Sequence, residues 1–193
     1  MKKHLSSFTY EEKIKYPTTV LNVIIKQTYQ HKDVLKSNTE VSRAIYEAAG
    51  IKHDNPLKYY KMLDSIDKDA GLCSVFKCER MVDRKKFALK LAEPRTQQDK
   101  ANVVNEIGIM KLGACANTLK CSQAFFYKNR FWIILELMDS SFTSMLTEME
   151  GGYCEEFCKY ALYQTVSGLV ELHNRNIIHR DIKSDNILCN EFG

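Results

Sequence analysis

A change in the spacing of apolar residues at Tyr59 constrains the fold of this chain more than any other feature. Beyond it, apolar residues gather into short alternating runs with turn-forming residues between them, a pattern that predicts β-strands. The predicted order is three strands, a helix, two strands and a long helix. This order indicates an α+β fold and excludes a repeated βαβ arrangement. The predicted strands cover residues 61–66, 74–78, 87–91, 123–127 and 131–137.

The two predicted helices carry signals at their ends. Thr96-Gln97-Gln98-Asp99 is typical of a helix start, because the Thr side chain can cap the first turn. Gly113 is the natural stop of this helix. The long helix, over about Glu155–Asn174, has an apolar face. That face consists of Cys158, Leu162, Thr165, Leu169 and Leu172.

The N-terminal part of the chain has a different pattern. Residues 8–30 predict a short helix and a longer one, since Thr9 and Glu12 have capping-box spacing and Pro17 suits a first helical turn. A polar, irregular stretch then runs to a break at Asn55-Pro56. We therefore divide the chain into three parts: a helical segment at 1–30, a linker at 31–58 and a folded domain at 59–193.

Charge and cysteine usage exclude several classes of protein. The 28 Lys and Arg against 24 Asp and Glu give a net charge of +4 without a basic run, so no nucleic-acid partner is expected. The longest apolar stretch, 131–135, is far too short for a membrane span, and no apolar secretion signal follows Met1. Seven cysteines without a C-x-x-C pair predict reduced thiols in a cytoplasmic protein rather than a metal site.

The stretch that carries chemistry is Ile-His-Arg-Asp-Ile-Lys-Ser-Asp-Asn at residues 178–186. Asp181 can accept a hydrogen bond from a substrate hydroxyl and orient it. Asn186 can offer an amide oxygen to a divalent cation, and Lys183 can neutralise a phosphoryl group in transfer. Phosphoryl transfer depends on positioning and positive charge, and this short segment provides both.

This segment resembles the H-R-D-x-x-x-x-N catalytic loop of protein kinases, and the Lys two residues after Asp181 is typical of their serine/threonine branch. The resemblance implies a protein-kinase-like α+β fold. Its N-terminal lobe would be complete, with a five-stranded antiparallel sheet and a regulatory helix, and its helical C-terminal lobe would be truncated. The resemblance also implies ATP and Mg²⁺ as cofactors.

Individual roles follow from the same resemblance. Lys90, in Ala88-Leu89-Lys90, would grip the ATP phosphates, and Glu106 would hold Lys90 in place. Asp181 would be the catalytic base, Lys183 would steady the γ-phosphate and Asn186 would bind the metal. The nucleotide would also contact a further set: Ile66, Val75, Ala88, Leu135, Glu136 and Met138.

Longer stretches narrow the resemblance to PAK-type kinases of the STE group. H-R-D-I-K-S-D-N-I-L at 179–188 looks like their catalytic loop, and N-E-I at 105–107 looks like part of their regulatory helix. Residues 9–23 are similar to the T-x-x-E-x-x-x-x-P-x-x-V-L-x-V end of the PAK autoinhibitory segment. This similarity implies an intramolecular or dimeric inhibitory contact through residues 8–30.

Two alternatives stay open at this point. Residues 8–30 also fit an ordinary capped helical hairpin. The hinge sequence at 136–139, Glu-Leu-Met-Asp, also resembles that of MAP-kinase kinases, which leaves the placement within the group open.

Three departures from the kinase pattern bear on function. The glycine-rich loop keeps only Gly71 in the turn between Ile66 and Val75, so we expect weaker nucleotide binding. No D-F-G or activation segment occurs before Gly193, which predicts a fragment of a longer product that does not turn over efficiently alone. We also expect the helix at 155–174 to lack the helices that normally pack on it, which leaves its apolar face open. The GTPase-binding motif of PAK relatives has no counterpart, so small-GTPase binding is unsupported.

The leading hypothesis is a PAK-type serine/threonine protein kinase. It would transfer the γ-phosphate of ATP to Ser or Thr hydroxyls of protein substrates in signalling. The alternative is a pseudokinase or truncated regulatory module that binds an intact kinase partner. The degraded glycine loop favours the alternative, whereas the presence of Lys90, Glu106, Asp181 and Asn186 opposes it.

Overall fold

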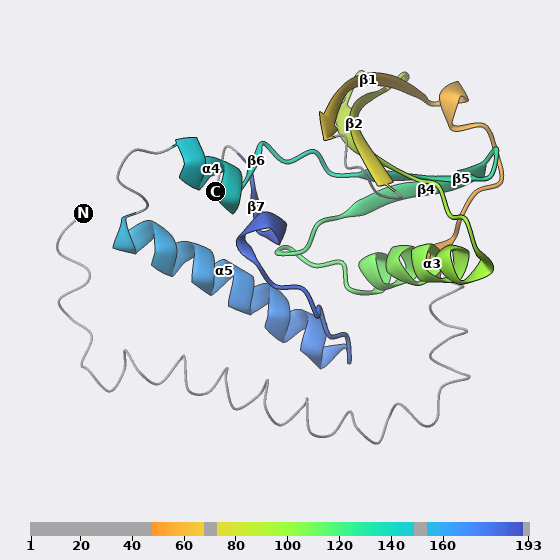
Figure 1. The fold of residues 1–193 in the computed structure, drawn as a ribbon. Helices are drawn as coiled ribbons and strands as arrows, with labels where there is room; N and C mark the ends of the chain where they lie inside the picture. The colour runs from red at the N-terminus through yellow and green to blue at the C-terminus, as the bar shows by residue number, and fades with distance from the viewer. Residues whose placement is uncertain (1–47, 68–72, 149–153, 191–193) are drawn as a thin grey trace.

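A computed structural model describes residues 48–67, 73–148 and 154–190 of the chain (Figure 1). The predicted helices within 1–30 and the glycine turn at 68–72 lie outside these ranges. The dominant feature is a five-stranded antiparallel sheet with the order β1-β2-β3-β5-β4, and this confirms the predicted sheet. Its strands are β1 (Tyr60–Asp67), β2 (Cys73–Arg80), β3 (Lys86–Ala92), β4 (Cys121–Tyr127) and β5 (Arg130–Leu135).

The fifth strand is shorter than its sequence predicts. The apolar run continues to Leu137, but β5 ends at Leu135. Pairing with β3 ends at the Ala88–Leu135 pair, and beyond it the backbone N–H of Glu136 bonds only on the β4 side, to the carbonyl of Lys120 at 3.0 Å. The connection between the sheet and the helical part of the chain begins at this point.

The two faces of the sheet are covered differently. One, here called the α3 face, is covered by helix α3 (Gln97–Leu112). The other, here called the aromatic face, is enclosed where β1 and β2 curl over β4 and β5 (Figure 1). Buried residues of the α3 face include Ala88, Ala92, Ala124, Ile133 and Leu135. Buried residues of the aromatic face are Tyr60, Cys78, Phe87, Leu89, Leu91, Phe125, Trp132 and Ile134.

Helix α3 begins and ends as the sequence predicts. The Thr96 hydroxyl accepts from the Asp99 N–H, and the Asp99 carboxylate accepts from the Thr96 N–H, which completes a capping box. Gly113 closes the helix, and its N–H donates to the carbonyl of Ile109. Ile107 is fully buried against the α3 face of the sheet and attaches the helix to it.

The described end of the predicted linker, residues 48–58, packs on the sheet. Lys52 forms a parallel bridge with Phe125: its N–H donates to the Ala124 carbonyl and its carbonyl accepts from the Phe126 N–H, both at 2.9 Å. Ala49 is buried in the core of the α3 face, and Pro56, in the short helix η1 (Pro56–Lys58), is fully buried. From residue 48 onward this segment therefore packs as part of the same folded unit as the sheet. Its pairing with β4 also covers the outer edge of that strand, which would otherwise expose unpaired backbone groups.

The helical part of the chain lies on the other side of the connection after β5 (Figure 1). Two short strands pair within it as an antiparallel ladder. None of the helices in the described ranges has the length and apolarity that crossing a bilayer requires. The elements are β6 (Ser140–Ser141), α4 (Phe142–Glu148), α5 (Glu155–Asn174), η2 (Ser184–Asn186) and β7 (Leu188–Cys189).

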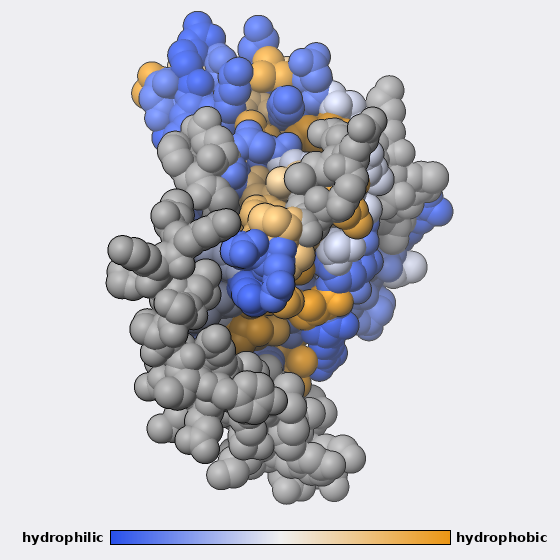
Figure 2. Space-filling view, turned by 90° about the vertical axis from the view of Figure 1, so that its left-hand side faces the viewer, coloured by the Kyte–Doolittle hydropathy of each residue, from blue (hydrophilic) through white to orange (hydrophobic). Residues whose placement is uncertain are grey.

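Helix α5 has the predicted bounds, and its apolar face is partly open, as the sequence predicts. Leu172 is buried as expected, whereas Leu162 is 62% exposed. The other buried residue is Gly168, which lies against the α3–β4 loop. Apolar spacing identified the stripe. The buried residues of α5 lie in its C-terminal half, and near its start Phe157 stacks on Phe142 of α4 with ring centres 5.4 Å apart. Figure 2, which looks at the molecule from the left-hand side of Figure 1, shows apolar residues at the surface among hydrophilic ones.

Replacing Ile107 by Ala should lower the free energy of unfolding by about 2–5 kcal/mol, because it leaves a cavity between α3 and the sheet. The matched control is Ile109→Ala, since Ile109 is on the same helix but 38% exposed. This control should lower the free energy of unfolding by clearly less. Chemical denaturation of the three proteins provides the comparison, and equal losses would contradict the packing described here.

Candidate functional site

Lys90 and Glu106 form an ion pair between the sheet and α3. Lys90 lies opposite Val75 in β2 and opposite Ile133 in β5, and the alternation of β3 directs it to the α3 face. Its Nζ is 2.5 Å from Oε1 of Glu106. Glu106 precedes the buried Ile107, so the packing of α3 determines where its carboxylate lies. The predicted pair is thus present and remains partly open to solvent.

The residues expected around an adenine ring lie along the same face of the sheet. Ala88 pairs with Leu135, and both are buried. Val75, opposite Lys90, packs at the margin of the same core, and Ile66 lies near the end of β1 with 48% of its surface exposed.

Glu136 and Met138 follow directly on β5 and are half-buried. One residue further, the N–H of Asp139 donates to the Cys189 carbonyl at 2.9 Å, so this segment is tied to β7 just beyond the loop that carries Asp181. The connection therefore links the sheet to the segment that follows the catalytic-loop sequence.

The loop at 179–186 brings three predicted residues together. The amide nitrogen of Asn186 donates to Oδ2 of Asp181 and to the carbonyl of Asp181, each at 2.8 Å. Lys183 Nζ is 3.3 Å from the same Oδ2. Because Asn186 uses its nitrogen here, its amide oxygen stays available as a metal ligand. All three side chains are exposed.

Backbone geometry and one tertiary contact shape this loop. Arg180 has φ of 70°, a left-handed conformation that turns the chain sharply just before Asp181. The N–H of Asp181 lies 3.3 Å from Nδ1 of His179 and donates to it. Ser184, in η2, accepts a hydrogen bond of 2.8 Å from the hydroxyl of Thr143 in α4. These contacts hold the loop against the helical part.

The Asp181 carboxylate is stabilised electrostatically. Its pKa is lowered, first by the hydrogen bond from Asn186 and next by that from Lys183. A folded-state pKa below the unfolded value adds stability that is present above the unfolded pKa and is lost as the pH falls through the folded one. At neutral pH the group is a carboxylate, the form that accepts a hydrogen bond from a hydroxyl.

The residues present fit a nucleotide with a divalent cation. Within the described ranges, no group of three or more His, Cys, Asp or Glu side chains could hold a cation by itself. A Mg²⁺-type ion commonly takes one or two protein oxygens and completes its shell with phosphate oxygens and water. The amide oxygen of Asn186 and the carboxylate of Asp181 are oxygen donors of that kind, and Lys90 supplies the positive charge that phosphates need.

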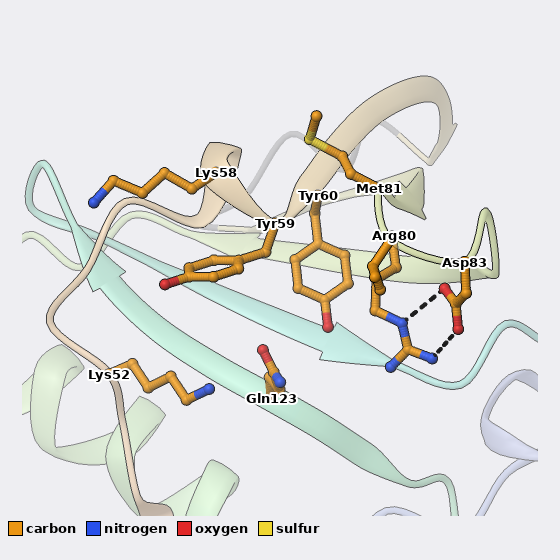
Figure 3. Close-up of a pocket in the computed structure, with 9 residues that line it drawn as sticks. Lys52, Lys58, Tyr59, Tyr60, Arg80, Met81, Asp83 and Gln123 are labelled. Atoms are coloured by element: carbon orange, nitrogen blue, oxygen red, sulfur yellow. Dashed lines mark hydrogen bonds and ion pairs between the residues drawn. The ribbon is translucent and has the colours of Figure 1, made fainter.

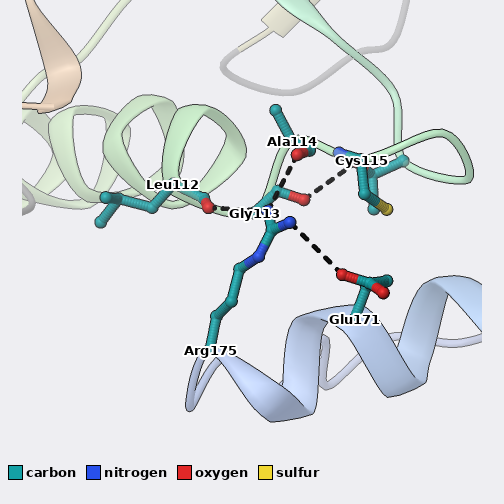
Figure 4. Close-up of polar contacts among 7 residues, drawn as sticks. Leu112, Gly113, Ala114, Cys115, Glu171 and Arg175 are labelled. Atoms are coloured by element: carbon teal, nitrogen blue, oxygen red, sulfur yellow. Dashed lines mark hydrogen bonds and ion pairs between the residues drawn. The ribbon is translucent and has the colours of Figure 1, made fainter.

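A joint between α3 and α5 connects the parts of the chain that carry these groups (Figure 4). Arg175, at the end of α5, donates to the carbonyl oxygens of Leu112 at 3.1 Å and Ala114 at 2.8 Å, just past the end of α3. In this way it caps carbonyls that the helix leaves unpaired. Glu171, one turn earlier, pairs with the same guanidinium at 3.3 Å.

Two glycines allow the close approach at this joint. A Cβ on Gly168 would lie 3.0 Å from the backbone oxygen of Asn117, and one on Gly113 would lie 2.6 Å from a methyl group of Leu172. Beside them, the amide of Asn117 donates to Gln164 at 2.6 Å. In the sequence Gly113 is recognisable only as a helix stop. The joint itself has no sequence signal, because its members come from separate segments.

The sheet, its paired helix and the loop with Asp181 are together those of the N-terminal lobe and catalytic loop of a protein kinase. The family model described as "Protein kinase domain" matches residues 69–193. The chain therefore belongs to the protein kinase family.

Similar proteins narrow this assignment. The chain is 34% identical over 137 residues to the serine/threonine-protein kinase shk1/pak1 of Schizosaccharomyces pombe, and 32% identical over 137 residues to pak-1 of Caenorhabditis elegans. Each alignment covers 69% of this chain but only 20% and 23% of the relatives, so the chain spans about a fifth of their length. These relatives are PAK-type kinases, which confirms the predicted resemblance.

A solved structure supports the fold. The kinase region of twitchin from C. elegans superposes with a TM-score of 0.66 at 25% sequence identity. The match covers 72% of this chain and 25% of that one.

Replacing Asn186 by Ala should raise the pKa of Asp181, because the Asn186 hydrogen bond is the largest cause of its lowering. Lys183→Met should raise it less. A pH titration followed by carboxyl-carbon NMR measures both effects. Ser184→Ala is the matched control, since Ser184 lies in the same loop but contacts Thr143 instead. An unchanged Asp181 pKa in the Asn186 variant would refute the hydrogen bond.

Proposed function

We propose that this chain provides the nucleotide-binding and catalytic-loop part of a PAK-type serine/threonine kinase, which transfers the γ-phosphate of ATP to protein hydroxyls. The observation that carries the proposal is the Lys90–Glu106 ion pair of 2.5 Å. It joins a strand lysine to a helical carboxylate, and the loop with Asp181 occurs in the same chain. The similarity to PAK-type kinases supports the same activity.

Each polar group has a defined task in this proposal. Lys90 binds the phosphates while Glu106 keeps its ammonium directed toward them. ATP supplies the phosphoryl group, and the accompanying cation, which we propose is Mg²⁺, offsets its negative charge. Asn186 binds the cation through the amide oxygen that its contact with Asp181 leaves available.

The remaining groups act on the substrate side. Asp181 is a carboxylate at neutral pH, so it can orient a substrate hydroxyl and accept its proton. Lys183, now paired with Asp181, can neutralise the γ-phosphate. The adenine contacts belong to the set on the α3 face of the sheet and the connection after it: Ile66, Val75, Ala88, Leu135, Glu136 and Met138.

Further parts of the proposal concern regulation and location. Residues 8–30 would make the inhibitory contact that their similarity to the PAK autoinhibitory segment implies; they lie outside the described ranges. Protein substrates would present Ser or Thr hydroxyls. All seven cysteines are free thiols, which supports a reducing compartment such as the cytoplasm.

Replacing Lys90 by Met should weaken the binding of an ATP analogue with Mg²⁺ by about tenfold or more, because a charge-assisted contact to phosphate is lost. Isothermal titration calorimetry of the intact chain measures this effect. Lys86→Met is the matched control, since Lys86 is an exposed lysine at the start of the same strand. Asn186→Ala should reduce the dependence of binding on Mg²⁺ without removing binding.

Equal affinities of the Lys90 and Lys86 variants would contradict the proposed site. A wild-type chain that binds neither the analogue nor Mg²⁺ would favour the alternative of a non-catalytic module. Transfer of labelled phosphate from ATP to a generic acceptor protein, abolished by Asp181→Asn, would establish the activity itself.

A further inference from the structure

A pocket lies on the aromatic face of the lobe, away from the groups assigned to the nucleotide (Figure 3). Its volume is about 550 Å³, within the range of about 300–1,000 Å³ that small-molecule sites occupy. None of the residues assigned to ATP or metal lines it. The lining residues are Lys52, Lys58, Tyr59, Tyr60, Arg80, Met81, Val82, Asp83 and Gln123.

Four separate segments build this pocket, here called the Tyr60 pocket. Lys52 comes from the segment paired with β4, Tyr60 from the start of β1, Arg80 from the end of β2 and Gln123 from β4. Figure 3 shows the Tyr60 hydroxyl pointing into the space between Gln123 and Arg80. These segments meet only in the folded lobe.

The hydroxyl of Tyr60 is a buried donor without a partner. Tyr60 is 3% exposed, and its oxygen makes no hydrogen bond within the described part of the chain. The nearby Arg80 guanidinium is only a donor, so it cannot accept the hydroxyl hydrogen, and its own hydrogen bonds of 2.9 and 2.5 Å go to Asp83. A buried hydroxyl without a partner costs free energy that a bound acceptor would recover.

The charges around the pocket favour an anion. Three cations line it, Lys52, Lys58 and Arg80, against the single carboxylate of Asp83. Lys58 pairs with Asp54 at the rim and Arg80 with Asp83. Lys52 forms no ion pair with any described residue, and its ammonium lies 5.7 Å from the Phe125 ring centre. A free cation and an unused hydroxyl donor therefore point to one acceptor group on a ligand.

The wall of the pocket suits an apolar ligand body. The Tyr59 ring is stacked on Phe125 with a centre distance of 5.9 Å, so it presents a fixed aromatic surface. Met81, 54% exposed, adds a flexible apolar contact. We propose that the Tyr60 pocket binds a small organic anion, a carboxylate or phosphate on an aromatic body, independently of the nucleotide site.

Titration of the ¹⁵N-labelled full chain with phenyl phosphate and with benzoate, followed by NMR, tests this proposal. Saturable shifts should occur at the backbone amides of Tyr60, Met81 and Gln123, and an ATP analogue should not displace either probe. Benzyl alcohol, which has the ring without the charge, should bind at least about tenfold more weakly. The tighter of the two anions identifies the head group, and saturable binding of either supports the site.

Two variants localise the binding. Tyr60→Phe removes only the hydroxyl and should lower the affinity for the tighter-binding anion by about tenfold. Lys52→Gln should lower the affinity for the same anion severalfold and make that affinity less dependent on salt concentration. The matched controls, Tyr160→Phe on α5 and Lys77→Gln on β2, are exposed positions away from the pocket and should leave the affinity unchanged.

Several results would overturn the proposal. One is saturable shifts at Lys90 and Glu136 in place of Tyr60 and Gln123. Another is equal binding of benzyl alcohol. A third is an affinity that Tyr60→Phe and Lys52→Gln both leave unchanged. Lys52 is exposed, so its variant keeps the test decisive even if Tyr60→Phe disturbs the core.

Discussion

Burial of Ile107 between α3 and the sheet is the contact on which the candidate site depends. The ion pair beside it, Lys90–Glu106, is partly exposed, and such pairs contribute only about 0–1 kcal/mol to stability. Packing, and not the ion pair, therefore places α3. The capping box at Thr96 fixes where the helix starts, and the burial of Ile107 fixes its rotation, so Glu106 faces β3. The position of the Glu106 carboxylate is thus a consequence of the burial of the next residue, Ile107.

A second constraint connects the lobe to the loop that carries Asp181. The connection after β5 is tied to β7 through Asp139. Helix α5 meets the end of α3 through Arg175 and the α3–β4 loop through Gly168. The hydrogen bonds in these contacts, one from the Asp139 N–H and two from the Arg175 side chain, all end on backbone carbonyls, which are rigid acceptors. Contacts of this kind can fix the sheet with α3 relative to the helical part of the chain without a large shared core. They also explain why α5 is buried only toward its C-terminal end.

The two faces of the sheet serve different chemistry. The α3 face keeps a lysine and a carboxylate together at the margin of a mainly aliphatic core, the arrangement on which the proposed phosphate binding rests. The aromatic face encloses large rings, and at its edge the buried Tyr60 hydroxyl finds no acceptor among the described residues. Because β-strand side chains alternate, neighbouring residues of β3 such as Leu89 and Lys90 belong to these separate environments.

The sequence by itself determined the local features: the strand and helix periods, the Thr96 cap, the Gly113 stop and the spacing within residues 179–186. Each of these depends on residues within one or two turns of one another, and the kinase resemblance supplied the pairing of Lys90 with Glu106. Only the tertiary structure decided that β5 lies between β3 and β4, that Lys52 pairs beside Phe125 and that Leu162 stays exposed. A periodic pattern shows which face of an element is apolar, but not which distant surface is shaped to cover it. The joint at Gly168 and the Tyr60 pocket arise from such distant meetings and leave no local signal in the chain.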